Sequence, residues 1–360
     1  MEKNDIQKGN RRYESVNGLR AYSALGIVLL HVYSNGEYHF SFVSLELITY
    51  LANLVFLFMM LSGFSMCCGY YDKILNGTIT PDQFYKKRYS KIWPFFASLC
   101  FLDLLLSPSI ESVYEVFANL TLCFGLLPNP DIQVIGVSWT LGVIFVFYML
   151  FPFFCFLLSN NKRAWLSLSV ATIFNYLCSI YFFNGDHMPK GFFQRGSFLF
   201  CAVYFLAGGM IYLYRSPLGK FSRHHRSRMQ LMCLAATGVA FIPGIPELYY
   251  VFLLATYLVY ALGNNRRILK NRFTRFLSDV SMEIYLCHMV VFRVLEKLKL
   301  LHILPWDIAN FLLTFILTTI GAVIVALMFR WAMYEAPAIL NKTKRYIPSL
   351  KMTEGDCNNG

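Results

Sequence analysis

The chain has 360 residues, of which 57% are hydrophobic and 14% are charged, whereas a soluble domain has about 25% charged residues. Long apolar runs recur from end to end, which excludes a soluble protein and predicts one all-α domain that crosses a membrane many times. The net charge of +12 comes from basic residues in short segments between the apolar runs, which is typical of cytoplasmic loops and argues against nucleic-acid binding.

The first half of the chain predicts five membrane helices. A basic tail, residues 1–15, leads into the first, and because no small-residue cleavage site follows, we interpret this helix as uncleaved. The five spans are expected at 16–34, 47–70, 92–107, 137–158 and 164–183. Pro94 is expected in the first turn of the third span. The apolar stretch within 108–136 is too short to cross, so we predict an interfacial or re-entrant helix there.

The second half predicts five more spans, at 196–214, 229–243, 247–263, 279–296 and 308–334. The last is long enough to be tilted. Strongly basic segments at 215–228 and 266–275 are expected to be cytoplasmic loops, whereas the outer connections contain few basic residues. This asymmetry predicts ten spans with both termini cytoplasmic. The membrane domain is expected at 16–336, with cytoplasmic tails at 1–15 and 337–360.

Two ionisable residues lie in the first span, Arg20 and His31. A step of eleven residues is about three helical turns, so they share one face and lie about 16 Å apart along the axis. Each one alone is compatible with snorkelling to the nearer headgroups. Their shared face favours a joint function, because ionisable groups at membrane depth usually face the bundle interior or a wet cavity.

Other polar residues also interrupt the apolar pattern. Ser62 and Gly63 in the second span are small enough for close helix packing. Glu335, at the end of the last span, is expected near the cytoplasmic surface, where it could pair with Arg20. The ten cysteines lie mostly in apolar runs and match no metal or haem spacing, so we expect neither a metal site nor a disulfide.

Aromatic and histidine side chains mark the fourth and ninth spans. Trp139 is expected at the outer interface, where a membrane anchor is the simplest interpretation. Tyr285 and His288 lie three residues apart on one face of the ninth span and are suited to hydrogen bonding with a polar ligand. A core histidine paired with a neighbour is the alternative for His288.

Six short motifs in this order resemble the bacterial integral-membrane acyltransferase family 3, the polysaccharide O-acetyltransferases. They are Arg20 and His31 in GLRAYSALGIVLLH, SGF at 62–64, the basic cluster FYKKRYSKIWP, WTLGVIFVFYMLFP, YLCH, and the terminal EAP. The resemblance covers nearly the whole chain. It implies a bundle of about ten membrane helices and the transfer of an acyl group, most often acetyl, from acyl-CoA to a sugar hydroxyl.

The resemblance also implies roles for particular residues. His31 and Arg20 would be catalytic, with His31 as the general base, and Glu335 would support the site. The acyl-CoA phosphates would lie against Arg20, Arg88 and Lys91, with Ser62 also on the donor side. The acceptor would contact Trp139, Tyr148, Tyr285 and His288. Acyl-CoA would be a co-substrate, with no permanently bound cofactor, and the acceptor a cell-surface polysaccharide or lipid-linked glycan at the bacterial cytoplasmic membrane.

The sequence departs from the family pattern at two places. The usual Arg-x-x-Arg of the basic cluster is Arg88-x-x-Lys91 here, and Lys keeps the charge but not the bidentate fork of Arg. Many members carry Glu in the fourth-span motif, where this chain has Ile144 and Phe145. A partner that orients His31 must therefore come from elsewhere in the chain.

Two other classes of function fit part of the pattern. A transporter or flippase would use Arg20 and His31 as an ion relay. Such proteins often contain repeated halves, and we find no repeat in the sequence. A structural or sensory membrane protein would need no chemistry. Transfer of labelled acetyl groups by the purified protein separates these alternatives from an enzyme.

Overall fold

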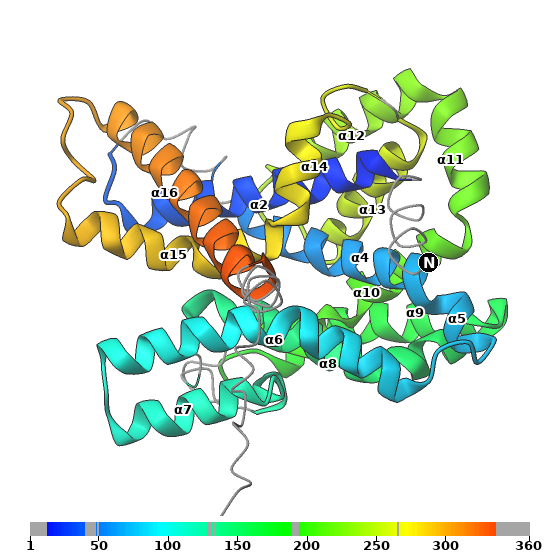
Figure 1. Cartoon of the computed structure of the whole chain (residues 1–360). Helices are drawn as coiled ribbons and strands as arrows, with labels where there is room; N and C mark the ends of the chain where they lie inside the picture. Colours follow the sequence, from blue (N-terminus) through cyan, green and yellow to red (C-terminus); the bar gives the residue numbers. More distant parts are fainter. Residues whose placement is uncertain are drawn as a thin grey trace, which may run out of the picture.

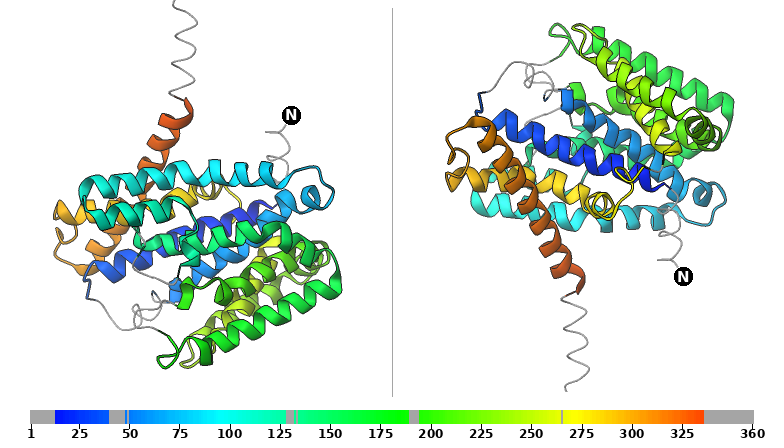
Figure 2. Two further views of the ribbon diagram at one scale, coloured as in Figure 1. Left: turned by 90° about the horizontal axis from the view of Figure 1, so that it is seen from below. Right: turned by 90° about the horizontal axis from the view of Figure 1, so that it is seen from above.

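The computed structural model describes residues 13–39, 48, 50–127, 132, 134–188, 194–264 and 266–335. Within these ranges the chain is helical and contains no β-strand, as the apolar runs predict (Figure 1). Figure 2 shows many of the helices running side by side, while α16 (Asp307–Arg330) crosses them obliquely. The tilt of the last span in the membrane stays a prediction.

Helix α2, Glu14–Asn35, is continuous through both Arg20 and His31. It packs against α4 (Leu54–Met66), α13 (Tyr249–Gly263), α14 (Arg272–Asp279), α15 (Ser281–Lys297) and α16, so elements from both halves of the chain surround it. Its buried face carries small and β-branched side chains: Ala21, Ala24, Ile27, Val28 and Val32. Gly18 permits a close approach, because a Cβ there would collide with the backbone of Leu269. The loop before α14 is thereby held against the start of α2.

The first half of the described chain alternates long helices with short ones. A nearly continuous run consists of η1 (Tyr50–Asn53), α4 (Leu54–Met66), η2 (Cys67–Tyr71) and α5 (Asp72–Leu75). It is followed by α6 (Pro81–Leu106), α7 (Ile110–Leu120) and η3 (Phe124–Leu126). Next come η5 (Gly136–Ser138), α8 (Trp139–Leu158), α9 (Asn161–Leu177) and η6 (Cys178–Phe182). Helix α7 is the short helix predicted between the third and fourth spans.

Helix α6 begins eleven residues before the predicted start at 92, so the expectation that Pro94 lies in a first turn is wrong. A capping box starts the helix: the Thr80 hydroxyl accepts from the Gln83 amide, and the Gln83 side chain accepts from the Thr80 amide, both at 3.3 Å. Pro81 occupies the first turn, where its missing N–H is not needed. Pro94 therefore lies inside the helix.

The second half contains η7 (Gln194–Gly196), α10 (Phe198–Leu213), α11 (Arg215–His224), α12 (Arg226–Ala240) and α13 (Tyr249–Gly263). It ends with α14 (Arg272–Asp279), α15 (Ser281–Lys297), α16 (Asp307–Arg330) and η8 (Trp331–Glu335). The basic segment 215–228 is helical, not a loop. Helix α11 bends away from α10 by 79° and packs against α13, where Gly263 makes room for Ser222.

Small residues bring α4 and α10 into backbone contact. A Cβ on Gly63 would collide with the carbonyl of Phe205, and a Cβ on Gly208 would collide with that of Met60. The rings of Phe56 and Tyr204 stack beside this contact, with centroids 4.4 Å apart. The prediction that Gly63 allows close packing is therefore confirmed.

Among the residues that the structure describes, five helical segments are long and apolar enough to cross a membrane, and a sixth is added if the bent pair α10–α11 is counted as one span. The five are Tyr50–Leu75, Pro81–Leu106, Gly136–Leu158, Asn161–Phe182 and Asp307–Met333. Helices α12, α13 and α15 have 15, 15 and 17 residues and are shorter than a full crossing. The chain is a polytopic membrane protein, and the count of ten spans stays a prediction.

Candidate active site

Two histidines from opposite ends of the sequence meet between α2 and α15. The ring centroids of His31 and His288 lie 5.1 Å apart, and the ring planes are nearly perpendicular, at 87°. His288 is fully buried, whereas His31 is half-buried. The two side chains form a pair, which we call the histidine pair, at the end of α2 that is remote from Arg20.

The two ring nitrogens of His288 have different surroundings. Its Nδ1 lies 2.7 Å from the carbonyl oxygen of Tyr285 and 3.2 Å from that of Ile284. Because carbonyl oxygens only accept hydrogen bonds, the network places the proton on Nδ1 and leaves Nε2 of the neutral ring as an acceptor. This Nε2 is buried and has no partner among the described residues. A buried acceptor without a partner is unfavourable, so Nε2 is suited to a donor from a neighbour or a substrate.

Tyr285 ties the histidine pair to the start of α8. Its hydroxyl donates to the carbonyl of Val137 at 3.0 Å and lies 2.7 Å from the Thr140 hydroxyl. Trp139, partly buried, stands between these two contacts in the sequence. The predicted acceptor residues Trp139, Tyr285 and His288 therefore come from one region, although the Tyr285 hydroxyl is already engaged by protein groups.

The Arg20 side chain is oriented by a serine of the second predicted span. Its Nη2 donates to the hydroxyl of Ser65, at 2.7 Å. Ser65 lies three residues after Ser62, the residue expected on the donor side, and Ser62 has no hydrogen bond of its side chain within the described ranges. The predicted pairing of Arg20 with Glu335 concerns a side chain outside the described part of the chain.

Arg88 projects from α6 toward the end of α4. One Nη donates to the hydroxyl of Tyr70 at 2.7 Å, the other lies 3.5 Å from Sδ of Met66, and the guanidinium also lies over the Tyr70 ring. Its Nε is buried without a partner among the described residues. The guanidinium is thus oriented by protein contacts, and one of its donors has no hydrogen-bond partner among the described residues.

Positive charges converge near Arg88. The charged groups that interact with the Lys91 ammonium are Arg88, Arg20, Glu283 and Arg330. Arg330 is fixed by Glu283, with 2.9 Å between Nε and Oε1, and it also donates to the carbonyl of Asp279. Four cations stand against two carboxylates, Glu283 and the Asp279 that interacts with Arg20, and this excess of positive charge would suit a multiply charged anion. We call Arg20, Arg88, Lys91 and Arg330 the basic cluster.

Tyr148 belongs with the basic cluster rather than with Trp139. It is half-buried and lies within electrostatic range of Arg20. It lies nine positions after Trp139 on α8, which corresponds to about 13 Å along the helix. Of the residues expected to bind the acceptor, Tyr148 is therefore the one placed on the Arg20 side.

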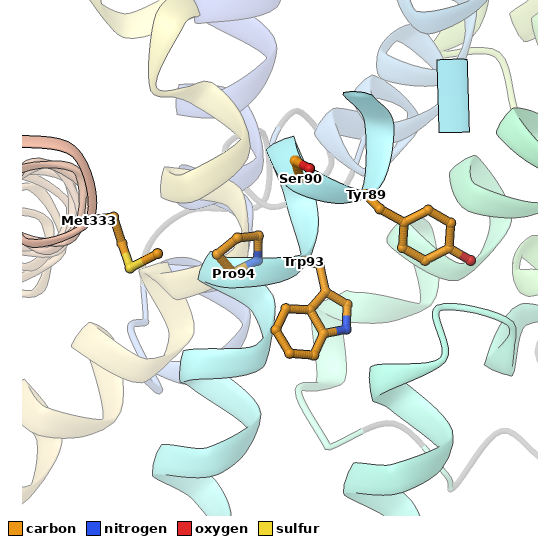
Figure 3. A pocket seen from close by; sticks show the side chains of 5 residues that line it. All are labelled: Tyr89, Ser90, Trp93, Pro94 and Met333. Atoms are coloured by element: carbon orange, nitrogen blue, oxygen red, sulfur yellow. The ribbon is translucent and has the colours of Figure 1, made fainter. Parts of the chain in front are cut away.

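A cleft of about 470 Å³ lies on another side of α6 (Figure 3). Tyr89, Ser90, Trp93 and Pro94 line it from α6, and Met333 lines it from η8. Because proline has no N–H, Pro94 leaves the carbonyl of Ser90 without its helical partner. A helix turns about 100° per residue, so Arg88 and Lys91 project from a different side of α6 than the centre of this lining. The cleft is separate from the basic cluster.

The site has two zones joined by α2. The basic cluster lies around Arg20, and the histidine pair lies around His31, about 16 Å away along the helix by its rise. The side chains of the first zone are of the kind that binds anions, and those of the second zone are of the kind that transfers protons.

Residue-by-residue reasoning missed Ser65, Tyr70, Glu283 and Arg330. The last two carried a usable signal, because charged residues within largely apolar helices are uncommon and usually have a partner. Ser65 and Tyr70 carried none, since serine and tyrosine are frequent along this helix and only packing selects among them.

A family model described as an acyltransferase domain, that of acyltransferase family 3, matches residues 13–331. No curated protein matches the chain. No solved structure matches it either.

Proposed function

Since the chain belongs to acyltransferase family 3 and is an acyltransferase, we propose that it moves an acyl group, most simply acetyl, from acyl-CoA to a sugar hydroxyl. One observation carries this proposal. The basic cluster lies around Arg20 at one end of α2, and the histidine pair lies around His31 toward the other end. CoA carries several phosphates, and an unreactive hydroxyl needs a base in reach.

The basic cluster would hold the donor. Arg88, oriented by Tyr70, and Lys91 beside it would contact phosphate oxygens, and Arg20, oriented by Ser65, would lie deeper on α2. The acyl-pantetheine arm would then extend along α2 toward His31, a distance of about 16 Å by the helix rise.

His31 would act as the general base. Histidine has an ordinary pKa near 6.5, so a neutral imidazole is available at physiological pH. The acceptor O–H proton passes to His31 while the oxygen attacks the thioester carbonyl. The C–O bond forms, the C–S bond breaks, and the departing CoA thiolate takes the proton from the His31 imidazolium. The histidine is neutral again at the end of the cycle.

The acceptor would be a glycan or lipid-linked sugar that reaches the histidine pair, where Trp139 lies at the start of α8. The cell envelope of a bacterium, with the protein in the cytoplasmic membrane, is the setting in which both substrates meet.

The test uses the purified full-length protein in lipid nanodiscs with acetyl-CoA labelled in the acetyl group. Label should pass to an acceptor in a glycolipid extract, and the slower release of acetate without acceptor should require His31. Transfer that is equal in wild type and His31→Ala would contradict the proposal. Uptake of substrate into proteoliposomes without any acyl transfer would support a transporter instead.

A further inference from the structure

We propose that His288 is a positioning residue for His31: its Nε2 accepts a hydrogen bond from the His31 ring and leaves the other His31 nitrogen as the bare base. This inference rests on the proposed role of His31 as the base. It supplies the orienting partner that the fourth-span motif lacks, since Ile144 and Phe145 cannot orient an imidazole.

The separation of the rings fits such a bond. An N–H···N bond of ordinary length is about 2.9 Å, and each nitrogen lies about 1 Å from its ring centre, so bonded imidazoles have centroids about 5 Å apart. The observed centroid separation is 5.1 Å. The bond itself is not formed at the present ring orientation, because Nε2 of His288 has no partner among the described residues.

Closing the bond requires only a rotation of the His31 ring. The outer torsion of a histidine side chain has a broad energy profile, so such a rotation is cheap. The His31 ring makes no hydrogen bond within the described ranges that would resist it, whereas His288 is anchored through Nδ1 to Tyr285 and Ile284. The anchored ring is therefore the acceptor, and the free ring is the donor that turns toward it.

The choice of tautomer follows from this arrangement. His288 already has its proton on Nδ1, so its Nε2 can only accept, and the His31 nitrogen that faces it must carry a proton. The remaining His31 nitrogen is then unprotonated and takes the acceptor O–H proton. In catalytic triads a buried carboxylate fixes the tautomer of the base in the same way. A neutral histidine does so without placing a charge in the bundle.

The experiment compares His288→Leu with His288→Gln in the full-length protein. The Leu side chain cannot accept a hydrogen bond, whereas the Gln carbonyl reaches about as far as Nε2. We expect His288→Leu to lower kcat about 100-fold with the KM for acetyl-CoA unchanged, and His288→Gln to stay within about 10-fold of wild type. His187→Leu, at an exposed histidine in a turn, is the matched control and should leave kcat unchanged.

A spectroscopic measurement separates positioning from a structural role. In protein labelled with ¹⁵N-histidine, solid-state NMR should show one tautomer for His31 in wild type and in His288→Gln, and a mixture of tautomers in His288→Leu. His31→Gln assigns the signal. This NMR measurement does not depend on enzymatic activity, so it tests the histidine pair even if the proposed reaction fails. An unchanged His31 tautomer in His288→Leu would overturn the inference, as would a rise in the acceptor KM with kcat intact.

Discussion

Arg330 near the end of α16 forms an ion pair with Glu283 near the start of α15, with 2.9 Å between Nε and Oε1. Glu283 is nearly buried, at 8% exposure. The pair joins the last two long helices beside the basic cluster, so it stabilises the bundle and also fixes one of the four cations.

Replacing one partner of this pair should destabilise the protein. Arg330→Met leaves the Glu283 carboxylate nearly buried without its cation, and breaking a buried pair costs about 3–5 kcal/mol. We expect the lower end of this range, because Arg330 is partly exposed. The double variant Arg330→Met/Glu283→Met should recover most of the stability, since apolar replacements of a buried pair are often neutral. Thermal unfolding in detergent provides the measurement, and equal stability of the single and double variants would contradict it.

The donor site is tested by Arg88→Ala combined with Lys91→Ala. Hydrogen bonds to a charged group contribute about 1.5–3 kcal/mol, so loss of phosphate contacts should raise the KM for acyl-CoA by about 10-fold or more while kcat changes little. Lys86→Ala is the matched control, because it removes an exposed cation from the same helix. A lower kcat with unchanged KM would argue that Arg88 and Lys91 serve only to set the topology.

The role of Ser65 is tested against its neighbour Ser62. Ser65 accepts the hydrogen bond of Arg20, so Ser65→Ala should raise the KM for acyl-CoA by about 3–10-fold, the equivalent of about 1 kcal/mol. Ser62→Ala, one turn away on α4, should have no effect. Steady-state kinetics of the two variants decide between them, and the reverse order of effects would place Ser62 on the donor.

His31 should be required for the chemical step. His31→Ala should lower kcat by about 10²–10⁴-fold, the usual effect of removing a general base, with expression and folding near wild type. His31→Gln should be nearly as poor, because an amide cannot take a proton near neutral pH. His224→Gln, at an exposed histidine of α11, is the control. If His31→Gln kept most of the activity, the base would have to be His288 or a group of the acceptor.

The topology with ten spans is tested by reporter fusions. Fusions at Gly36, Gly125 and Gly185 should report an external position, and fusions at Gly77, Gly219 and Asn265 an internal one. Gly77 and Gly185 are the best sites, because both lie in turns with open space around them. Asn265 lies outside the described residues. Two or more inverted readings would refute ten spans with cytoplasmic termini.

The bounds of most helices can be predicted from the sequence, because long apolar runs end at charged or turn residues. The predicted start of α6, at 92, is wrong, although Thr80, Pro81 and Gln83 carry a capping signal for a start at Pro81. The charge of the segment 215–228 predicts a loop, whereas the segment contains a short amphipathic helix, α11, whose Leu218 packs against the core. At both places the sequence contains a local helix signal, a capping motif in one and an amphipathic pattern in the other. A search for long apolar runs alone does not detect such signals.

The membrane class, the acyltransferase family and the placement of Arg20 and His31 on one helix follow from the amino-acid sequence, because all three depend on composition, motif order or the local helical repeat. Which side chains complete the site depends instead on contacts between helices that are distant in the sequence. Ser65 reaches Arg20 across 45 residues, Glu283 meets Arg330, and His288 meets His31 from the far end of the chain. Such contacts depend on how the helices pack against α2 and against one another. Close approaches at small residues help to set this packing, at Gly18 against Leu269 and at Gly63 against Phe205, and no local pattern assigns these partners.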